Sequence, residues 1–213
     1  MGTLTLGVDI GQRVDPTAIA LADAEVRQDG EVHFAIRFLE RLPLGTSYPM
    51  VTKRIAEIHG NLCAQMGAGG VDDARLRLFL DATGVGQPVA DTLAAAGVPV
   101  TAVYFTHGDR RTVENGEVRL GKGWLVSRLK TLAQTGRLHL PKTSESVAMQ
   151  TELLDYEIRV DDNANDRYGA FKTGAHDDLV TAVGLAVQED PPPGWAPLSP
   201  EVSAWFRAAG IAT

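Results

Sequence analysis

Cysteine is nearly absent from this chain, and long apolar runs and a surplus of basic charge are missing altogether. Cys63 is the single cysteine, so no disulfide can form within the chain, and we expect a reduced, buried thiol in a cytoplasmic protein. No apolar run reaches the ~18 residues that a membrane span requires. The first residues, MGTLTLGVDIG, lack the basic and long apolar regions of a secretory signal. The sequence therefore predicts a protein without a membrane partner.

The charge balance is acidic, with 20 basic and 27 acidic side chains and a net charge of −7. A nucleic-acid-binding domain usually presents a basic surface, so this balance argues against such a partner. However, a cluster of carboxylates that holds cations also lowers the net charge. A domain that receives its DNA from another protein needs little affinity of its own. The acidic balance is therefore compatible with a metal-dependent enzyme that acts on DNA.

The 213 residues are enough for one α/β domain, and a hydrophobic content of 44% is ordinary for a globular protein. We expect residues 1–190 to form that domain. Residues 191–213 are predicted to be a Pro-rich tail with a short amphipathic helix, EVSAWFRAAG. The tail either packs on the domain's own core or binds a partner.

The hydrophobic pattern of the first half predicts three strands followed by a β-α-β unit. In order, we expect strands at residues 3–10, 17–26 and 32–42, a helix at 49–66, a strand at 75–82, a helix at 86–97 and a strand at 98–105. The first three strands are joined by short turns, which favours an antiparallel meander. The β-α-β unit implies parallel pairing with a right-handed crossover.

The second half adds a hairpin and several helices. Asn115-Gly116 lies between short β-capable flanks, a pattern typical of a β-hairpin. Further along we expect a helix from residue 122 to 136, a short strand at 137–141, a helix at 144–158 capped by Ser144 and a helix at 173–187. This order predicts a ribonuclease H-like α/β fold, in which helices flank a mixed central sheet with an inserted hairpin.

Four acidic residues stand at the ends of predicted elements. Asp9 ends the first strand in GVDIG, Asp81 ends the fourth in LDATGVG, and Asp177 and Asp178 open the last helix in GAHDDLV. If the first and fourth strands are neighbours, Asp9 and Asp81 project into one place, and a helix N-terminus packed there adds the acidic pair. Each residue also has a structural explanation, as a turn residue or as a favourable charge at a helix N-terminus.

Carboxylates forced together repel one another, and their pKa values rise, so such a cluster requires compensation. Oxygen ligands suit Mg²⁺ or Mn²⁺. Two such ions about 4 Å apart can hold the attacking and leaving oxygens of a phosphodiester. The pattern therefore predicts two-metal phosphodiester hydrolysis. Asp15, in RVDPTAI, and His176 are auxiliary candidates, although an Asp-Pro turn and a structural histidine explain them equally simply.

Four motifs, in this order, resemble the nuclease domain of the large terminase subunits of tailed bacteriophages. They are GVDIGQRVDPTAIAL, LDATGVGQPVADTL, KGWLVSRLKTLAQTGRLHLP with the TELLDYE helix, and GAHDDLVTAVGLAV. The resemblance spans about residues 4–188. It implies an endonuclease that cleaves double-stranded DNA during viral genome packaging with two divalent cations, in the bacterial host cytoplasm if the protein is phage-encoded.

Carried over by position, the resemblance implies that Asp9, Asp81 and Asp178 are the catalytic metal ligands and that Asp177 and Asp15 are auxiliary ligands. In this family the nuclease usually follows an ATPase motor. The sequence has no G-x-x-x-x-G-K-S/T loop and little room for a motor before the first motif. We therefore expect a motor on another polypeptide segment, with a small terminase subunit or a portal as further partners.

The densest basic stretch surrounds the predicted hairpin, which the resemblance places near DNA. It contains Arg110, Arg111, Arg119, Lys122, Arg128 and Lys130. If the hairpin lies beside the acidic site, these charges would guide the phosphate backbone toward the metal ions, with weak, salt-sensitive and sequence-independent binding. A solvated basic surface is the alternative explanation.

Three other functions fit parts of the pattern. A Holliday-junction resolvase shares the fold and the carboxylates, and would act on branched DNA as a homodimer. A sugar or acetate kinase-type phosphotransferase has a first phosphate loop that GVDIG resembles, but it also needs an adenosine motif, which we do not find. A non-catalytic packaging module would carry a vestigial acidic cluster and dock a partner through Trp205-Phe206.

Overall fold

The structure is a computed structural model that describes residues 3–11, 15–160, 166–169 and 176–192. Its strands are β1 (Thr3–Asp9), β2 (Ala18–Val26), β3 (Val32–Arg41), β4 (Leu76–Asp81), β5 (Thr101–Thr106), β6 (Arg111–Glu114), β7 (Glu117–Gly121), β8 (Leu138–His139), β9 (Glu157–Val160) and β10 (Asp166–Gly169). Its helices are α1 (Tyr48–Ala68), the short 3-10 helix η1 (Asp73–Arg75), α2 (Gly86–Ala95), α3 (Lys122–Gln134), α4 (Ser144–Asp155) and α5 (Asp178–Ala186).

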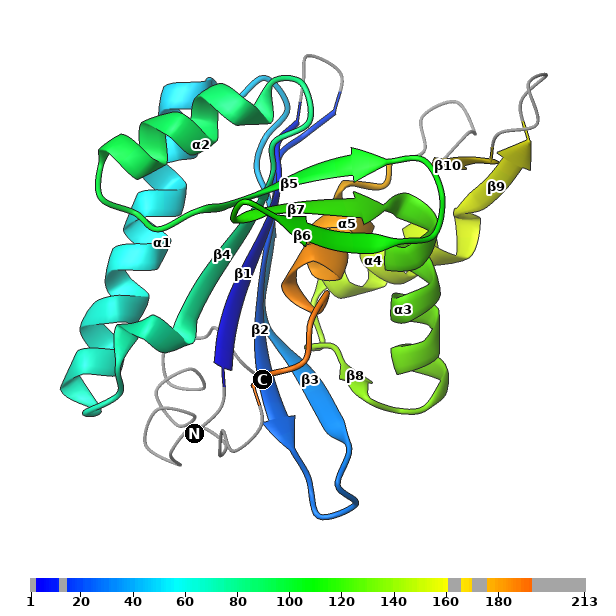
Figure 1. The fold of residues 1–213 in the computed structure, drawn as a ribbon, viewed down its shortest axis with the longest axis horizontal. Helices are drawn as coiled ribbons and strands as arrows, with labels where there is room; N and C mark the ends of the chain where they lie inside the picture. Colours follow the sequence, from blue (N-terminus) through cyan, green and yellow to red (C-terminus); the bar gives the residue numbers. More distant parts are fainter. Residues whose placement is uncertain (1–2, 12–14, 161–165, 170–175, 193–213) are drawn as a thin grey trace.

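Eight of the described strands form one mixed sheet in the order β6-β7-β5-β4-β1-β2-β3-β8, and β9 and β10 pair separately. Helices α1 and α2 cover one face of the large sheet, and α3, α4 and α5 cover the other (Figure 1). The first three strands are an antiparallel meander, while β4 pairs in parallel with β1 and β5. The predicted ribonuclease H-like α/β fold with an inserted hairpin is confirmed.

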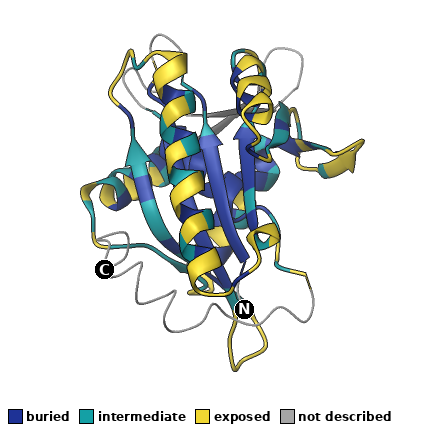
Figure 2. Ribbon diagram, turned by 90° about the vertical axis from the view of Figure 1, so that its left-hand side faces the viewer, coloured by how far each residue is buried: buried dark blue, intermediate teal, exposed yellow. Residues whose placement is uncertain are grey.

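The alternation of side chains along β1 divides the core into two halves. Leu4, Leu6 and Val8 pack with helices α1 and α2, because successive side chains of a strand point to opposite faces. The other face of β1 presents Thr5 and Gly7 to helix α5. The central strands are buried on both faces, as Figure 2 shows by their dark colour between the helices.

Helix α5 is buried along its whole length, from Asp178 to Ala186. A helix that is apolar all round is typical of a protein interior. It reaches the sheet because Gly7 has no side chain: a Cβ there would lie 2.1 Å from the Ala182 carbonyl oxygen and 2.5 Å from the Ala186 nitrogen. The glycine in the GVDIG motif thus sets the distance between β1 and α5, the two elements that carry Asp9 and Asp178.

The second motif glycine of this kind is Gly86, at the start of α2. A Cβ there would lie 1.7 Å from the carbonyl oxygen of Asp81. Only glycine lets α2 begin directly against the end of β4. Packing beside Asp81 therefore explains the last glycine of LDATGVG. The turn before α2 holds the end of β4 in place.

The hairpin around Asn115-Gly116 is present as β6 and β7. Both turn residues have positive φ, 52° for Asn115 and 82° for Gly116, as a tight hairpin turn of this sequence requires. Val113 and Arg119, on the two strands of the hairpin, are exposed. Strand β7 pairs in parallel with β5, so the hairpin extends the main sheet.

Several sequence expectations were wrong in detail. The cap of α4 is Thr143, whose side chain accepts a hydrogen bond from the Ser146 nitrogen, and not Ser144. That helix ends at Asp155 and β9 follows it, because the Tyr156 backbone is already extended. Helix α5 begins at Asp178, since His176 and Asp177 are not helical.

Other expectations are only partly covered by the described residues. The first residues of the last predicted helix, 173–175, and most of the predicted tail, 193–213 with Trp205-Phe206, lie outside them, and the boundary at residue 190 stays a prediction. Cys63 is half-buried and not fully buried as expected, and burial raises the pKa of its thiol. Among the described helices, none is long and apolar enough to cross a membrane.

We predict that Gly7→Ala lowers the free energy of unfolding by about 2–3 kcal/mol or more, because the added methyl group meets the rigid backbone of α5. Gly60→Ala is the matched control. Gly60 lies in α1 with nothing within 4 Å of an added Cβ, so its replacement should stabilise the protein by up to ~1 kcal/mol. Urea denaturation measures both changes. Equal stability of the two variants would contradict the packing argument.

Candidate metal centre

The predicted acidic residues come together at one end of the sheet. They line an open cavity of about 240 Å³. Its lining residues are Asp9, Ile10, Gly11, Asp15, Asp81, Thr83, Phe105, Lys122, Asp177 and Asp178. The cavity collects the carboxylates because β1 and β4 are parallel neighbours, with Val8 paired to Leu80, and because the N-terminus of α5 packs beside them.

Asp9 and Asp81 are the last residues of the adjacent strands β1 and β4, and their side chains interact directly. Burial, followed by the charge of Asp81, raises the pKa of the Asp9 carboxyl well above its usual range. Burial also raises the pKa of Asp81, although the Thr83 hydrogen bonds oppose the shift. The Thr83 nitrogen donates to Asp81 Oδ1 over 2.8 Å. The two carboxylates cannot both ionise cheaply without a nearby positive charge.

Lys122 supplies part of that positive charge. It lies at the first turn of α3, and its Nζ is 3.3 Å from Asp177 Oδ2 and 5.4 Å from the centre of the Phe105 ring. Burial lowers the pKa of this ammonium group, but the charges of Asp177 and Asp9 raise it more, so the net shift is upward. Lys122, predicted from sequence as a DNA contact, therefore lies inside the carboxylate cluster.

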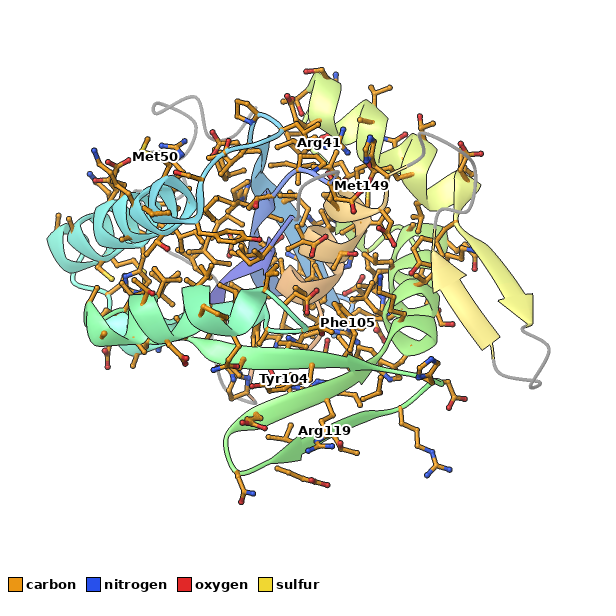
Figure 3. The ribbon with its side chains drawn as sticks, turned by 90° about the horizontal axis from the view of Figure 1, so that it is seen from above. Arg41, Met50, Tyr104, Phe105, Arg119 and Met149 are labelled. Atoms are coloured by element: carbon orange, nitrogen blue, oxygen red, sulfur yellow. The ribbon has the colours of Figure 1, made fainter. Side chains whose placement is uncertain are left out.

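Asp178 is almost inaccessible to solvent, with a side chain 3% exposed. Burial raises its pKa, and the guanidinium of Arg41 opposes the shift. Arg41 Nε donates to Asp178 Oδ2 over 2.5 Å. In Figure 3, Arg41 lies between the end of β3 and helix α4, above α5. Within the described part of the chain, Asp178 Oδ1 has no hydrogen-bond partner.

Of the auxiliary candidates, Asp15 lines the same cavity, and His176 lies beside Asp15 and Asp178. His176 Nδ1 is 3.6 Å from Asp15 Oδ1 and 3.7 Å from Asp178 Oδ1. Both distances are too long for a direct hydrogen bond. The Asp15 side chain is 59% exposed. His176 is thus placed to orient a water molecule or a ligand oxygen between two carboxylates.

The other predicted DNA contacts divide into two groups. Arg110 and Arg119 are exposed beside and on the hairpin. Arg111 pairs with Glu189 over 2.7 Å, and Arg128 pairs with Asp190 over 2.6 Å. These two guanidinium groups are paired with carboxylates of the segment after α5 and are less exposed than Arg110 and Arg119.

Two residues beside the centre were not predicted as site residues from the sequence, although one of them, Glu152, lies in the TELLDYE segment. Arg41 ends β3, and Glu152 lies in α4, where it accepts hydrogen bonds from the Leu179 and Val180 nitrogens over 3.1 and 3.2 Å. Burial and the charge of Asp178 raise the pKa of Glu152 to about 7. An acidic residue on a helix and a basic residue at a strand end are ordinary surface patterns, so only the folded arrangement identifies them.

The donor set fits a hard divalent cation. It consists of carboxylate oxygens, the ligands that Mg²⁺ and Mn²⁺ prefer, and a buried carboxylate oxygen of Asp178 lacks a partner in the described structure. As the side chains stand, no group of three or more His, Cys, Asp or Glu residues within the described ranges is close enough to hold an ion. The Lys122 ammonium interacts with Asp177, Asp9 and Asp81 and neutralises part of their charge.

Comparison with solved structures places this fold among viral terminase nucleases. The chain is similar to the large terminase nuclease from thermophilic phage G20c, with 20% identity, a TM-score of 0.62, and coverage of 89% of this chain and 83% of that one. The human cytomegalovirus terminase nuclease domain, solved after a Mn soak, is 16% identical with a TM-score of 0.53, and the match covers 88% and 83% of the two chains.

A longer protein also matches. The large terminase of bacteriophage HK97 is 17% identical with a TM-score of 0.57, over 88% of this chain and 39% of that one. No protein-family model matches the sequence, and no curated protein matches it. These likenesses show the fold, and they confirm that the fold resembles that of terminase nuclease domains, as predicted.

We predict that the metal-free protein loses stability as the pH rises. Glu152 has a folded pKa of about 7 against 4.5, and the pKa values of Asp9 and Asp81 are also raised. A raised carboxyl pKa contributes stability that is present below the unfolded pKa and is lost as the pH passes through the folded pKa. The midpoint temperature of thermal unfolding should therefore decrease as the pH is raised from 4.5 to 7.

Added Mn²⁺ should offset this loss, and its stabilising effect should be larger at pH 8 than at pH 5, because the ion and protons compete for the same oxygens. Asp9→Asn is the comparison variant. It should stabilise the metal-free protein at pH 8 by on the order of 1 kcal/mol and remove most of the response to Mn²⁺. Thermal unfolding that is independent of pH and of Mn²⁺ would contradict this electrostatic account.

Proposed function

We propose that this protein is a metal-dependent endonuclease that cleaves double-stranded DNA during viral genome packaging. The observation that carries the proposal is the convergence of Asp9, Asp81, Asp177 and Asp178, from two strand ends and one helix start, on one open cavity. Such a cluster destabilises the fold unless cations compensate it. The similarity to terminase nuclease structures, one of them solved after a Mn soak, supports the same chemistry.

In the proposed mechanism, Asp9, Asp81 and Asp178 hold the divalent ions, with Asp177 and Asp15 as auxiliary ligands. Two divalent ions, when bound, supply charge neutralisation at the attacking and leaving oxygens of the phosphodiester. Water adds to phosphorus, one P–O bond breaks, and a proton from the water ends on the departing oxygen or the solvent.

The remaining residues of the centre act on the phosphate and the water. Lys122 holds a positive charge over the cavity and can donate to a phosphate oxygen once its contact with Asp177 is shared with an ion. His176, between Asp15 and Asp178, orients the water. The face of the Phe105 ring makes a cation–π interaction with the Lys122 ammonium. In Figure 3, Phe105 lies on the α5 side of β5.

We further propose that the hairpin formed by β6 and β7 contacts the DNA backbone. Arg119 is 56% exposed and lies with Tyr104 on the outer side of the hairpin sheet (Figure 3), where the two residues are register partners on β7 and β5. Arg110 is exposed at the base of the hairpin. Exposed guanidinium groups bind phosphate without reading sequence, so we expect weak sequence preference.

The function is tested by plasmid cleavage with Mn²⁺, with Mg²⁺ and with a chelator. We expect nicking or linearisation with either ion and none with chelator. Asp81→Ala should reduce cleavage by at least ~100-fold, because it removes a ligand of the reacting centre. Asp91→Ala, in an exposed position of α2, is the control and should cleave as the wild type does. Linear and branched DNA of equal length should be cut similarly, which separates this enzyme from a junction resolvase.

The DNA path is tested by the salt dependence of binding. In a Ca²⁺ or metal-free buffer, Arg110→Ala and Arg119→Ala should each make the slope of log K against log salt less negative by about 0.9, the loss of one phosphate contact. Lys53→Ala is the control. Lys53 is 68% exposed on α1, outside the hairpin, and its removal should leave the slope unchanged. Equal slopes for all variants would exclude the hairpin from the DNA path.

One observation favours a second function. The Lys122 ammonium already neutralises part of the carboxylate cluster, as it would in a packaging module that has no metal ion. Mn²⁺ titration by calorimetry separates the two functions. Binding that is lost in Asp81→Ala supports the nuclease, whereas an inert wild-type protein supports the non-catalytic module.

A further inference from the structure

The two oxygens of the Asp178 carboxylate have different surroundings. Oδ2 accepts the 2.5 Å hydrogen bond from Arg41 Nε. Oδ1 is buried and, within the described residues, has no hydrogen-bond partner. A buried carboxylate oxygen without a donor is costly, and His176 Nδ1, at 3.7 Å, is too far from this oxygen to donate a hydrogen bond to it. Asp178 lines the cavity of the candidate metal centre, so this oxygen is the one available to a cation.

Arg41 connects Asp178 to a second acidic residue. Its Nη2 pairs with Glu152 Oε1 while its Nε pairs with Asp178, so one planar guanidinium group joins β3, α4 and α5. The fork geometry of a guanidinium fixes the directions of both hydrogen bonds, which a flexible ammonium group cannot do. Arg41 is 28% exposed and Glu152 is 8% exposed, so the contact is largely shielded from water.

Glu152 also holds the helix on which Asp178 stands. Its Oε2 accepts hydrogen bonds from the backbone nitrogens of Leu179 and Val180, over 3.1 and 3.2 Å. The first nitrogens of a helix have no partner within it, and the side chain of the N-cap residue Asp177 makes no capping bond. A glutamate from α4 therefore caps α5, and it does so one and two residues after Asp178.

We propose that Arg41 and Glu152 are positioning residues for the metal centre, which together fix the backbone and the carboxylate of Asp178 so that Oδ1 faces the cation. This proposal rests on the proposed nuclease function. Neither Arg41 nor Glu152 lines the cavity, so both act through Asp178. Mutation of a residue that orients a metal ligand by a hydrogen bond typically lowers metal affinity by 10- to 100-fold.

A purely structural role would also bury an arginine–glutamate pair, so the test requires a matched pair elsewhere. Arg54 and Glu40 provide it: Arg54 Nε is 3.0 Å from Glu40 Oε2. Glu40 is the neighbour of Arg41 on β3, and Arg54 comes from α1 on the opposite face of the sheet. The side chains of Arg54 and Glu40 are 39% and 27% exposed, so this pair is more exposed than Arg41 and Glu152, and its removal does not reach Asp178.

The experiment is Mn²⁺ calorimetry on the full chain, with steady-state plasmid cleavage as a second readout. Arg41→Gln should weaken Mn²⁺ binding by 10- to 100-fold and lower kcat with little change in KM for DNA. Arg41→Lys should rescue only part of the affinity. Arg54→Gln should match the wild type in both readouts. Circular dichroism and the thermal midpoint verify that each variant is folded.

Glu152→Gln and Glu152→Ala form the second series. Glutamine keeps an oxygen for the Leu179 and Val180 nitrogens, so its loss of Mn²⁺ affinity should be smaller than that of alanine. If Arg41→Gln does not fold, the isosteric Glu152→Gln carries the test. Unchanged or tighter Mn²⁺ binding in the Arg41 and Glu152 variants, beside an active wild type, overturns the positioning role alone. A wild type that neither binds Mn²⁺ nor cleaves DNA overturns the proposed function and this inference with it.

Discussion

The close packing of α5 against β1 determines where the chemistry of this molecule lies. Because Gly7 has no Cβ, the helix backbone comes so close to the strand that a side chain at this position would overlap with it. Because Asp9 follows Gly7 by two residues and Asp178 is the first residue of the helix, this one contact brings acidic groups from opposite ends of the chain together. The parallel pairing of β1 with β4 places Asp81 beside Asp9, because both residues end their strands at the same edge of the sheet.

The charge created by this packing dominates the energetics of the site. Burial raises the pKa values of Asp9, Asp81 and Asp178, so the protein resists ionising them. Two basic residues oppose this: Lys122 inside the cluster and Arg41 behind it. The protein itself thus neutralises part of the charge of the site, yet the site retains carboxylate oxygens that a divalent cation would satisfy better.

Much of the fold followed from the sequence because its periodic patterns are local. The meander, the hairpin at Asn115-Gly116 and the helices were predicted from alternation, turn residues and helical spacing, and the structure confirms them. The boundaries were less certain. The last helix was predicted to start at residue 173, whereas α5 begins at Asp178, because His176 and Asp177 are compatible with a helix as well as with a loop.

The site divides in the same way. The structure brings together the motif carboxylates and places Lys122 among them, because strand ends and a helix start converge in this fold. Their roles as metal ligands stay predictions. Arg41 and Glu152 could not be found, since Arg41 lies 111 residues from Glu152 and 137 residues from Asp178 in the chain. The ion pairs of Arg111 and Arg128 with the segment after α5 were equally invisible to local patterns.

The most direct test of the central claim is anomalous X-ray diffraction from crystals soaked in Mn²⁺. The account predicts anomalous density in the cavity between Asp9, Asp81 and Asp178, with Asp178 Oδ1 as a ligand and with Lys122 moved away from Asp177. Crystals of Asp81→Ala treated in the same way should lose most of that density. A wild-type cavity without density, in which Lys122 still pairs with Asp177, would contradict the account and leave an acidic cluster neutralised by the protein alone.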